Sequence, residues 1–157
     1  MKQTIILGLM LLVFGWLAND VYSDVYEHQS VFTSQELISP GDRIQDSQIS
    51  VYDDRIVIRL VGANWAKYTD TNSMDPLLDY GATGIEVRPE SKEDIQVGDV
   101  ITYNADWTDN LVAHRVIETG YDSEGWYANT KGDNVSFADP GKTRFEDIEW
   151  ILAGVLY

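Results

Sequence analysis

Apolar and polar residues alternate in short runs along most of the chain after residue 38. Residues 48–52 alternate with a period of two, and Asp53-Asp54 forms a turn into a second run at 55–60. Further runs, separated by Gly, Asp and Asn, occupy residues 65–69, 84–89, 97–103, 111–117, 125–130 and 150–157. Short strands with turn residues between them are typical of antiparallel β-structure. The pattern predicts a mostly β domain, a compact antiparallel barrel or sandwich, with one turn of helix near 144–148.

The chain begins with an uncharged apolar stretch at residues 4–18, which follows Lys2 and precedes an acidic segment. A cleaved secretory signal and an uncleaved anchor both fit such a stretch. Small residues are missing from the usual cleavage positions, and Trp16 with Tyr22 and Tyr26 suits a membrane-interface belt. We therefore expect an N-terminal transmembrane helix within residues 1–20. The positive-inside rule then predicts a single-pass membrane protein with a cytoplasmic N-terminus and an extracytoplasmic domain.

Residues 21–38 are expected to form a stalk or a juxtamembrane helix, and the pattern does not decide between the two. Ser39-Pro40-Gly41-Asp42 is a turn signal. We take it as the start of a β-rich domain at 39–157, so that the chain carries one folded domain behind its anchor.

Composition excludes several classes of function. Of 157 residues, 11 are basic and 26 acidic, which gives a net charge of −15. This balance argues against nucleic-acid binding, because no basic patch is present to neutralise phosphates. The chain has no cysteine and only two histidines, His28 and His114. Thiolate chemistry, disulfides and cysteine zinc sites are excluded, and we expect neither a metal nor a cofactor.

A serine stands in the turn at residues 69–76. Ser73 is a weak nucleophile unless a base activates it. The backbone N–H of Ser73 and the hydroxyl of Thr71 have the right spacing to form an oxyanion hole, which is worth roughly 2.7–4 kcal/mol per donor in a transition state. Polar residues that bond their own backbone in a turn explain this segment equally well.

Candidates for a base and an orienting acid follow later in the chain. On a strand, Val112, His114 and Val116 would share one face. A neutral imidazole activates a serine near neutral pH, although a lone histidine among apolar residues is more often a core residue. Lys131 is the alternative base. Asp133 and Asp139 are both candidates for orienting His114, and both are also ordinary turn aspartates.

Four segments together resemble a known family. They are, in chain order, Asn72-Ser73-Met74-Asp75-Pro76, Gly98-Asp99-Val100-Ile101, His114-Arg115-Val116-Ile117 and Lys131-Gly132-Asp133-Asn134. Their order and spacing resemble the type I signal peptidases, most closely the archaeal and endoplasmic-reticulum branch. The bacterial branch has a lysine where this chain has His114. The resemblance covers about residues 56–157 and agrees with an N-terminal anchor.

The resemblance implies a role for each matching residue. Ser73 would be the acylating nucleophile, His114 its general base and Asp139 the triad acid, while Asp133 would hold the site together and Thr71 would line the oxyanion hole. It also implies a compact antiparallel β catalytic core at the membrane surface. Such an enzyme is a serine endopeptidase that removes signal peptides from exported preproteins. Its partners would be preproteins and the lipid bilayer. The resemblance does not decide whether accessory subunits take part.

Asn72 departs from the family pattern, because most members have glycine before the nucleophile. Asparagine tolerates positive φ better than other residues with a side chain, so the turn can form. The extra β domain of the bacterial enzymes has no room here, and residues 19–55 match nothing in the family. A competing hypothesis is an inactive, surface-exposed binding domain with the same fold, in which His114 points away from Ser73. A soluble self-cleaving repressor conflicts with the anchor and with the charge.

Overall fold

The computed structural model describes residues 38–157. The expected anchor at 1–20 and all but the last residue of the expected stalk at 21–38 lie outside the described residues. No helix within residues 38–157 is long and apolar enough to cross a membrane. This part of the chain is built from antiparallel strands. The predicted mostly β class is therefore confirmed for the described residues.

The strands fall in the runs that alternation marked. They are β1 (Ile49–Val51), β2 (Ile56–Ile58), β3 (Ala63–Lys67), β4 (Thr83–Val87), β5 (Val100–Asn104), β6 (Leu111–Asp122), β7 (Gly125–Lys131) and β8 (Ile148–Leu156). Three 3₁₀ turns accompany them: η1 (Asp46–Gln48), η2 (Lys92–Asp94) and η3 (Phe145–Asp147). The last is the expected helical turn near 144–148. β6 is longer than predicted, because its pairing with β7 continues beyond a bulge between Val116 and Glu118.

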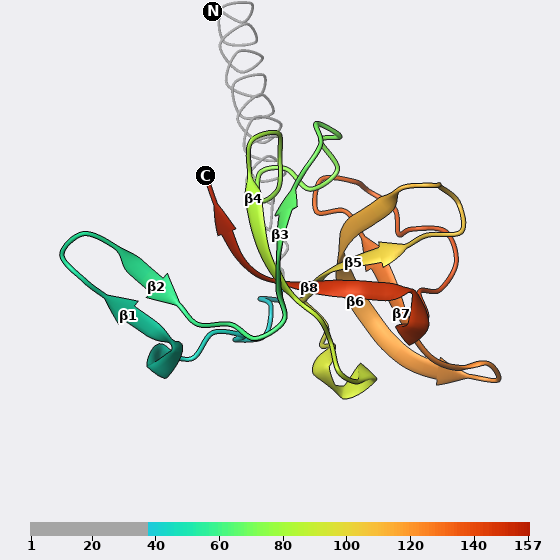
Figure 1. Cartoon of the computed structure of the whole chain (residues 1–157). Helices are drawn as coiled ribbons and strands as arrows, with labels where there is room; N and C mark the ends of the chain where they lie inside the picture. Colours follow the sequence, from blue (N-terminus) through green and yellow to red (C-terminus); the bar gives the residue numbers. More distant parts are fainter. Residues whose placement is uncertain (1–37) are drawn as a thin grey trace, which may run out of the picture. The chain divides into compact units, whose positions relative to one another are not determined.

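The body is a six-stranded sheet in the order β3-β4-β8-β5-β6-β7 (Figure 1). Every neighbouring pair is antiparallel. The last strand in sequence, β8, therefore lies in the interior of the sheet between β4 and β5. Bulges interrupt the pairing of β4 with β8, of β5 with β8 and of β6 with β7. Bulges bend a strand and increase its twist, so the sheet can curve around a core.

Apolar side chains are buried on both faces of the sheet. One cluster contains Ile101, Tyr103 and Val116, and Val112 packs against it. The other contains Met74, Leu78, Val100 and Leu152. Neighbouring residues of β5 thus enter different clusters, as strand alternation requires. Val112 and Val116 share a cluster, which confirms the expected face of β6, and His114 lies between them in the sequence.

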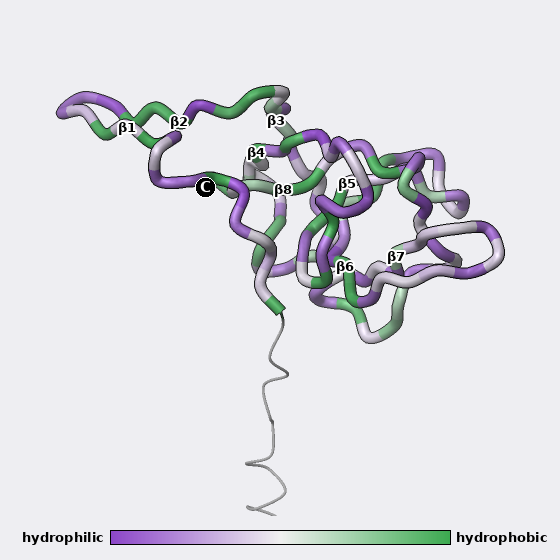
Figure 2. Tube along the Cα trace, turned by 90° about the horizontal axis from the view of Figure 1, so that it is seen from below, coloured by the Kyte–Doolittle hydropathy of each residue, from purple (hydrophilic) through white to green (hydrophobic). Residues whose placement is uncertain are grey.

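The β1–β2 hairpin forms a separate two-stranded sheet that stands apart from the body (Figure 1). Its cross-strand pairs Ile49–Ile58 and Val51–Ile56 place four apolar side chains on one face. All four are exposed, with Val51 at 74% and Ile56 at 65%. Figure 2 shows the apolar colouring along both strands of this hairpin.

The predicted turn at residues 39–42 leads into a tightly held segment. Asp99, which is fully buried, accepts hydrogen bonds from the backbone N–H groups of Gly41 and Gln96 at 2.8 Å and forms an ion pair with Arg43. Gly98 has a φ of 103°, and a Cβ there would lie 2.5 Å from the Ser39 carbonyl oxygen. The segment is therefore fixed to the body at Gly98 and Asp99.

Candidate active site

The loop between β3 and β4 carries Ser73. Met74 and Leu78 of this loop are 3% and 4% exposed and belong to the second core cluster, whereas Ser73 is only half-buried. Burial of these two apolar side chains fixes the loop on the body. The serine side chain is thereby held at the surface next to β6.

Asn72 adopts the conformation that glycine would favour. Its φ is 59°, and it is the one residue other than glycine with positive φ within residues 38–157. Asparagine is among the side-chain-bearing residues that tolerate this region best, so the departure from the family pattern leaves the turn intact. Asn134 supports the turn from the loop after β7. Its side-chain amide donates to the Asn72 carbonyl at 2.9 Å, and its backbone N–H donates to the Ser73 carbonyl at 2.9 Å.

His114 lies on β6, opposite Ile101 of β5, and is 7% exposed. Its Nε2 is 3.0 Å from Ser73 Oγ. This distance is within the hydrogen-bond reach that a nucleophile and its base require. The structure thus joins residues that are 41 positions apart in the sequence.

Asp139 completes a contiguous set of three side chains. The His114 Nδ1 atom is 2.9 Å and 2.7 Å from the two carboxylate oxygens of Asp139. Burial raises the pKa of this carboxyl, but the hydrogen bond with His114, together with the neighbouring hydroxyls of Thr130 and Tyr103, outweighs burial and leaves the pKa below its usual range. The carboxylate is therefore ionised near neutral pH, and it favours the imidazole tautomer with a proton on Nδ1 and a free lone pair on Nε2.

Asp133 has a different partner. Arg115 donates to its two carboxylate oxygens from Nε and Nη2, both at 2.7 Å, and donates from Nη1 to the Gly98 carbonyl at 2.6 Å. The two aspartates that the sequence left undecided are thus separated by geometry. Asp139 contacts His114, whereas Asp133 anchors the loop after β7 to β6.

Thr71 lies beside the serine, with its Oγ1 3.2 Å from Ser73 Oγ. Within residues 38–157, the backbone N–H of Ser73 donates to no backbone group. The Thr71 hydroxyl is therefore close to the nucleophile, and no backbone acceptor among the described residues competes for the Ser73 N–H. Lys131, the alternative base, is directed elsewhere: its Nζ donates to the carbonyls of Gly132 and Val135 at 3.1 Å and 2.6 Å.

Gly132 lies where the two halves of the site meet. A Cβ at this position would stand 2.5 Å from the Ser73 carbonyl oxygen and 3.1 Å from His114 Nε2. No side chain fits there without moving the serine loop or the imidazole. Glycine at this position lets the loop after β7 approach both groups closely.

Tyr103 and Thr130 are site neighbours that sequence reasoning missed. The Tyr103 hydroxyl donates to Asp139 Oδ2 at 2.9 Å, and Thr130 Oγ1 donates to the Tyr103 hydroxyl at 3.0 Å. Both residues are 2% exposed. Alternation marks them as inward-facing strand residues, but no local signal identifies a contact that depends on the pairing of β5, β6 and β7.

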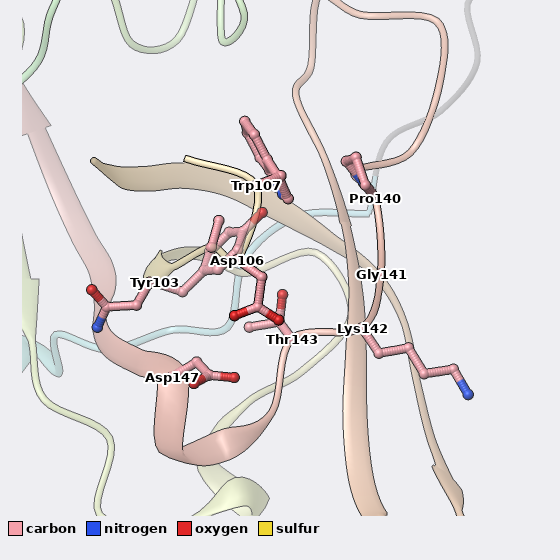
Figure 3. Close-up of a pocket in the computed structure, with 10 residues that line it drawn as sticks. Tyr103, Asp106, Trp107, Pro140, Gly141, Lys142, Thr143 and Asp147 are labelled. Atoms are coloured by element: carbon pink, nitrogen blue, oxygen red, sulfur yellow. The ribbon is translucent and has the colours of Figure 1, made fainter. Parts of the chain in front are cut away.

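A cavity of about 250 Å³ lies beside Tyr103, the residue whose hydroxyl donates to Asp139 (Figure 3). Tyr103 lines it together with Trp107, Pro140 and Thr143. The Lys142 side chain extends away from the other lining residues in Figure 3, and its ammonium group pairs with Asp122. Within residues 38–157, no group of three metal-ligating side chains is found.

The site places three groups in contact one after another: a half-buried hydroxyl, an imidazole and an ionised carboxylate. This arrangement activates a serine for attack on a carbonyl. Searches against protein-family models, curated proteins and solved structures find no match to this chain.

Proposed function

We propose that this protein is a membrane-anchored serine endopeptidase of the signal peptidase I type, which cleaves signal peptides from exported preproteins. The observation that carries the proposal is the contiguous set of Ser73 Oγ, His114 Nε2 and the Asp139 carboxylate, joined by contacts of 3.0 Å and 2.7 Å. The binding-domain hypothesis predicted that His114 points away from Ser73. The 3.0 Å contact speaks against it.

Acylation follows from the roles of these groups. Ser73 Oγ attacks the carbonyl carbon of the scissile peptide while its proton passes to His114 Nε2. Asp139 holds the Nδ1 proton and stabilises the imidazolium. The negative charge on the substrate oxygen is met by the Ser73 backbone N–H and the Thr71 hydroxyl. The C–N bond then breaks, His114 protonates the leaving amine, and an ester on Ser73 remains.

Deacylation reverses the proton path. A water molecule gives a proton to His114 Nε2 as its oxygen attacks the ester carbonyl. The C–O bond to Ser73 breaks, the proton returns to Ser73 Oγ, and the signal peptide leaves with a free carboxylate. The N-terminal anchor belongs to the same proposal. It would keep the domain at the extracytoplasmic surface of the membrane. Preproteins emerge there with small residues at positions −1 and −3 before the cleaved bond.

The direct test uses the full chain in detergent and a preprotein with alanine at positions −1 and −3. Ser73→Ala and His114→Ala should each lower kcat by at least about 10³-fold, because each removes one member of the triad. Mass spectrometry of the product N-terminus gives both the rate and the cleaved bond. Ser123→Ala, in the exposed turn between β6 and β7, is the matched control and should cleave like the wild type. Processing by Ser73→Ala at the wild-type rate would refute the proposal.

A further inference from the structure

We infer that Tyr103 is a positioning residue for the proposed triad, which orients the Asp139 carboxylate toward His114 through its hydroxyl, and that Thr130 fixes this hydroxyl. The inference rests on the proposed function and assigns a task to two residues outside the triad. They come from β5 and β7, on either side of the strand that carries His114.

The contacts form a closed ring. The Tyr103 hydroxyl donates to Asp139 Oδ2 at 2.9 Å, and Thr130 Oγ1 donates to the Tyr103 hydroxyl at 3.0 Å. The backbone N–H of Asp139 donates to the Thr130 carbonyl at 2.8 Å. Asp139 is therefore held at its backbone by Thr130 and at its carboxylate by Tyr103. Rotation of the carboxylate away from Nδ1 would break the tyrosine bond.

The direction of each hydrogen bond is fixed by chemistry. An ionised carboxylate only accepts hydrogen bonds, so the single hydroxyl proton of Tyr103 is the one shared with Asp139. Thr130 must then supply the proton between the two hydroxyls. Burial, together with the neighbouring Asp139 charge, raises the pKa of Tyr103 above its usual value. The hydroxyl thus remains a neutral donor at every pH at which a peptidase of this kind would work.

Asp139 Oδ2 accepts from both Tyr103 and His114, at 2.9 Å and 2.7 Å. The two donors compete for the electron density of one oxygen. Removal of the tyrosine hydroxyl leaves more negative charge facing Nδ1, which favours the protonated imidazolium. A variant without the hydroxyl should therefore need a higher pH to reach full activity. It should also lose rate, because the carboxylate is free to rotate.

A purely structural role for Tyr103 is the competing explanation, since its ring belongs to the first core cluster. Tyr103→Phe keeps the ring and removes only the hydroxyl. Tyr68 provides a matched control in the same domain, because its hydroxyl donates to the buried carboxylate of Glu86 at 3.2 Å. Tyr68→Phe removes the same type of bond from a carboxylate that has no contact with His114.

The experiment measures kcat, KM and the pH profile of kcat/KM for the full chain. Tyr103→Phe should lower kcat by about tenfold with little change in KM, because a hydrogen bond to a charged group that positions the triad is lost. The acid limb of its profile should move to higher pH. Thr130→Val should also lower kcat and move the acid limb to higher pH. Thr130→Ser keeps the hydroxyl and should resemble the wild type in kcat and in the acid limb. Tyr68→Phe should leave kcat and the acid limb unchanged.

A second readout does not depend on activity. The proton on His114 Nδ1 gives a low-field resonance in ¹⁵N-histidine-labelled protein, and Tyr103→Phe should move it whereas Tyr68→Phe should not. An unmoved resonance together with wild-type kcat and pH profile in Tyr103→Phe would overturn the inference. Failure of the proposed function gives a different result, namely a Ser73→Ala variant that cleaves as fast as the wild type.

Discussion

The loop after β7 carries two aspartates of equal burial and different partners. The Asp133 and Asp139 side chains are each 9% exposed. Asp133 is bound by a bidentate guanidinium, which is the geometry of a structural ion pair, whereas Asp139 meets an imidazole that also contacts Ser73. Burial alone therefore says nothing about their roles. The partner of each carboxylate decides which property of the protein it controls.

Asparagine substitutions should separate these two roles. Asp139→Asn should lower kcat by about 10³- to 10⁴-fold, because an amide favours the wrong imidazole tautomer and no longer stabilises the imidazolium. Asp133→Asn should instead lower the free energy of unfolding by about 3 kcal/mol, because Arg115 keeps a buried charge without its counter-ion. Preprotein cleavage and urea unfolding measure the two effects. A larger loss of kcat in Asp133→Asn than in Asp139→Asn would contradict the assignment.

The lowered pKa of Asp139 also predicts how stability depends on pH. A carboxyl whose pKa is lower in the folded than in the unfolded state stabilises the protein above the unfolded value, which is about 3.9 for aspartate. This contribution is lost as the pH falls below that value and through the folded-state pKa. The unfolding free energy of the wild type should thus exceed that of Asp139→Asn near neutral pH and converge toward it in acid. Urea titrations of both proteins across this range provide the measurement, and a difference independent of pH would contradict the prediction.

Among the elements, the β1–β2 hairpin differs most from the rest of the structure. A two-stranded hairpin is marginally stable by itself in water. Among residues 38–157, its strands pair only with each other, and its apolar face is exposed. The hairpin therefore adds little buried apolar area to the domain, in contrast to the six strands of the body.

Replacing apolar residues of the hairpin should consequently have a small effect. The double variant Val51→Thr, Ile56→Thr should change the free energy of unfolding of the domain by no more than about 0.5 kcal/mol, because exposed side chains lose little on substitution. Ile101→Thr is the buried counterpart and should cost at least about 2 kcal/mol. Urea unfolding followed by tryptophan fluorescence measures both. Equal losses in the two proteins would mean that the hairpin packs onto the body in solution.

Elements were easier to predict from the sequence than their arrangement. Alternation is a local property, so it located the strands within a few residues. Sheet order depends on pairing between strands that are far apart in the sequence. No pattern within a short segment places β8 between β4 and β5. The site shows the same limit. Ser73 and His114 lie in recognisable segments, but the choice of Asp139 over Asp133 and the contacts of Tyr103 follow from the registers of β5, β6 and β7.

At the scale of the whole described domain, a chain of buried polar contacts links its first residues to the site. Arg43 pairs with Asp99, which follows Gly98 in the sequence. The Gly98 carbonyl accepts from Arg115, and Arg115 holds Asp133. The segment at 38–43 is thus bound to the part of the body that supports the loop after β7.

Breaking the first contact should destabilise the domain. Arg43→Met keeps an apolar stem but leaves the fully buried Asp99 without its cation, which should cost about 3 kcal/mol of unfolding free energy. Arg55→Met is the control. Its ion pair with Asp54 joins side chains that are 63% and 72% exposed, and such pairs contribute little. Thermal or urea unfolding distinguishes the two, and an unchanged midpoint in Arg43→Met would contradict the proposed support.

The hairpin has a practical consequence for experiments on this protein. The chain contains no cysteine, so an introduced thiol is the only one that a maleimide dye can modify. Asp54, at the hairpin tip, is 72% exposed, and the hairpin pairs with no strand of the body. A fluorophore attached at Asp54→Cys would therefore report on molecules that approach this apolar face. The label would leave unchanged the contacts of the serine, the imidazole and the loops that hold them.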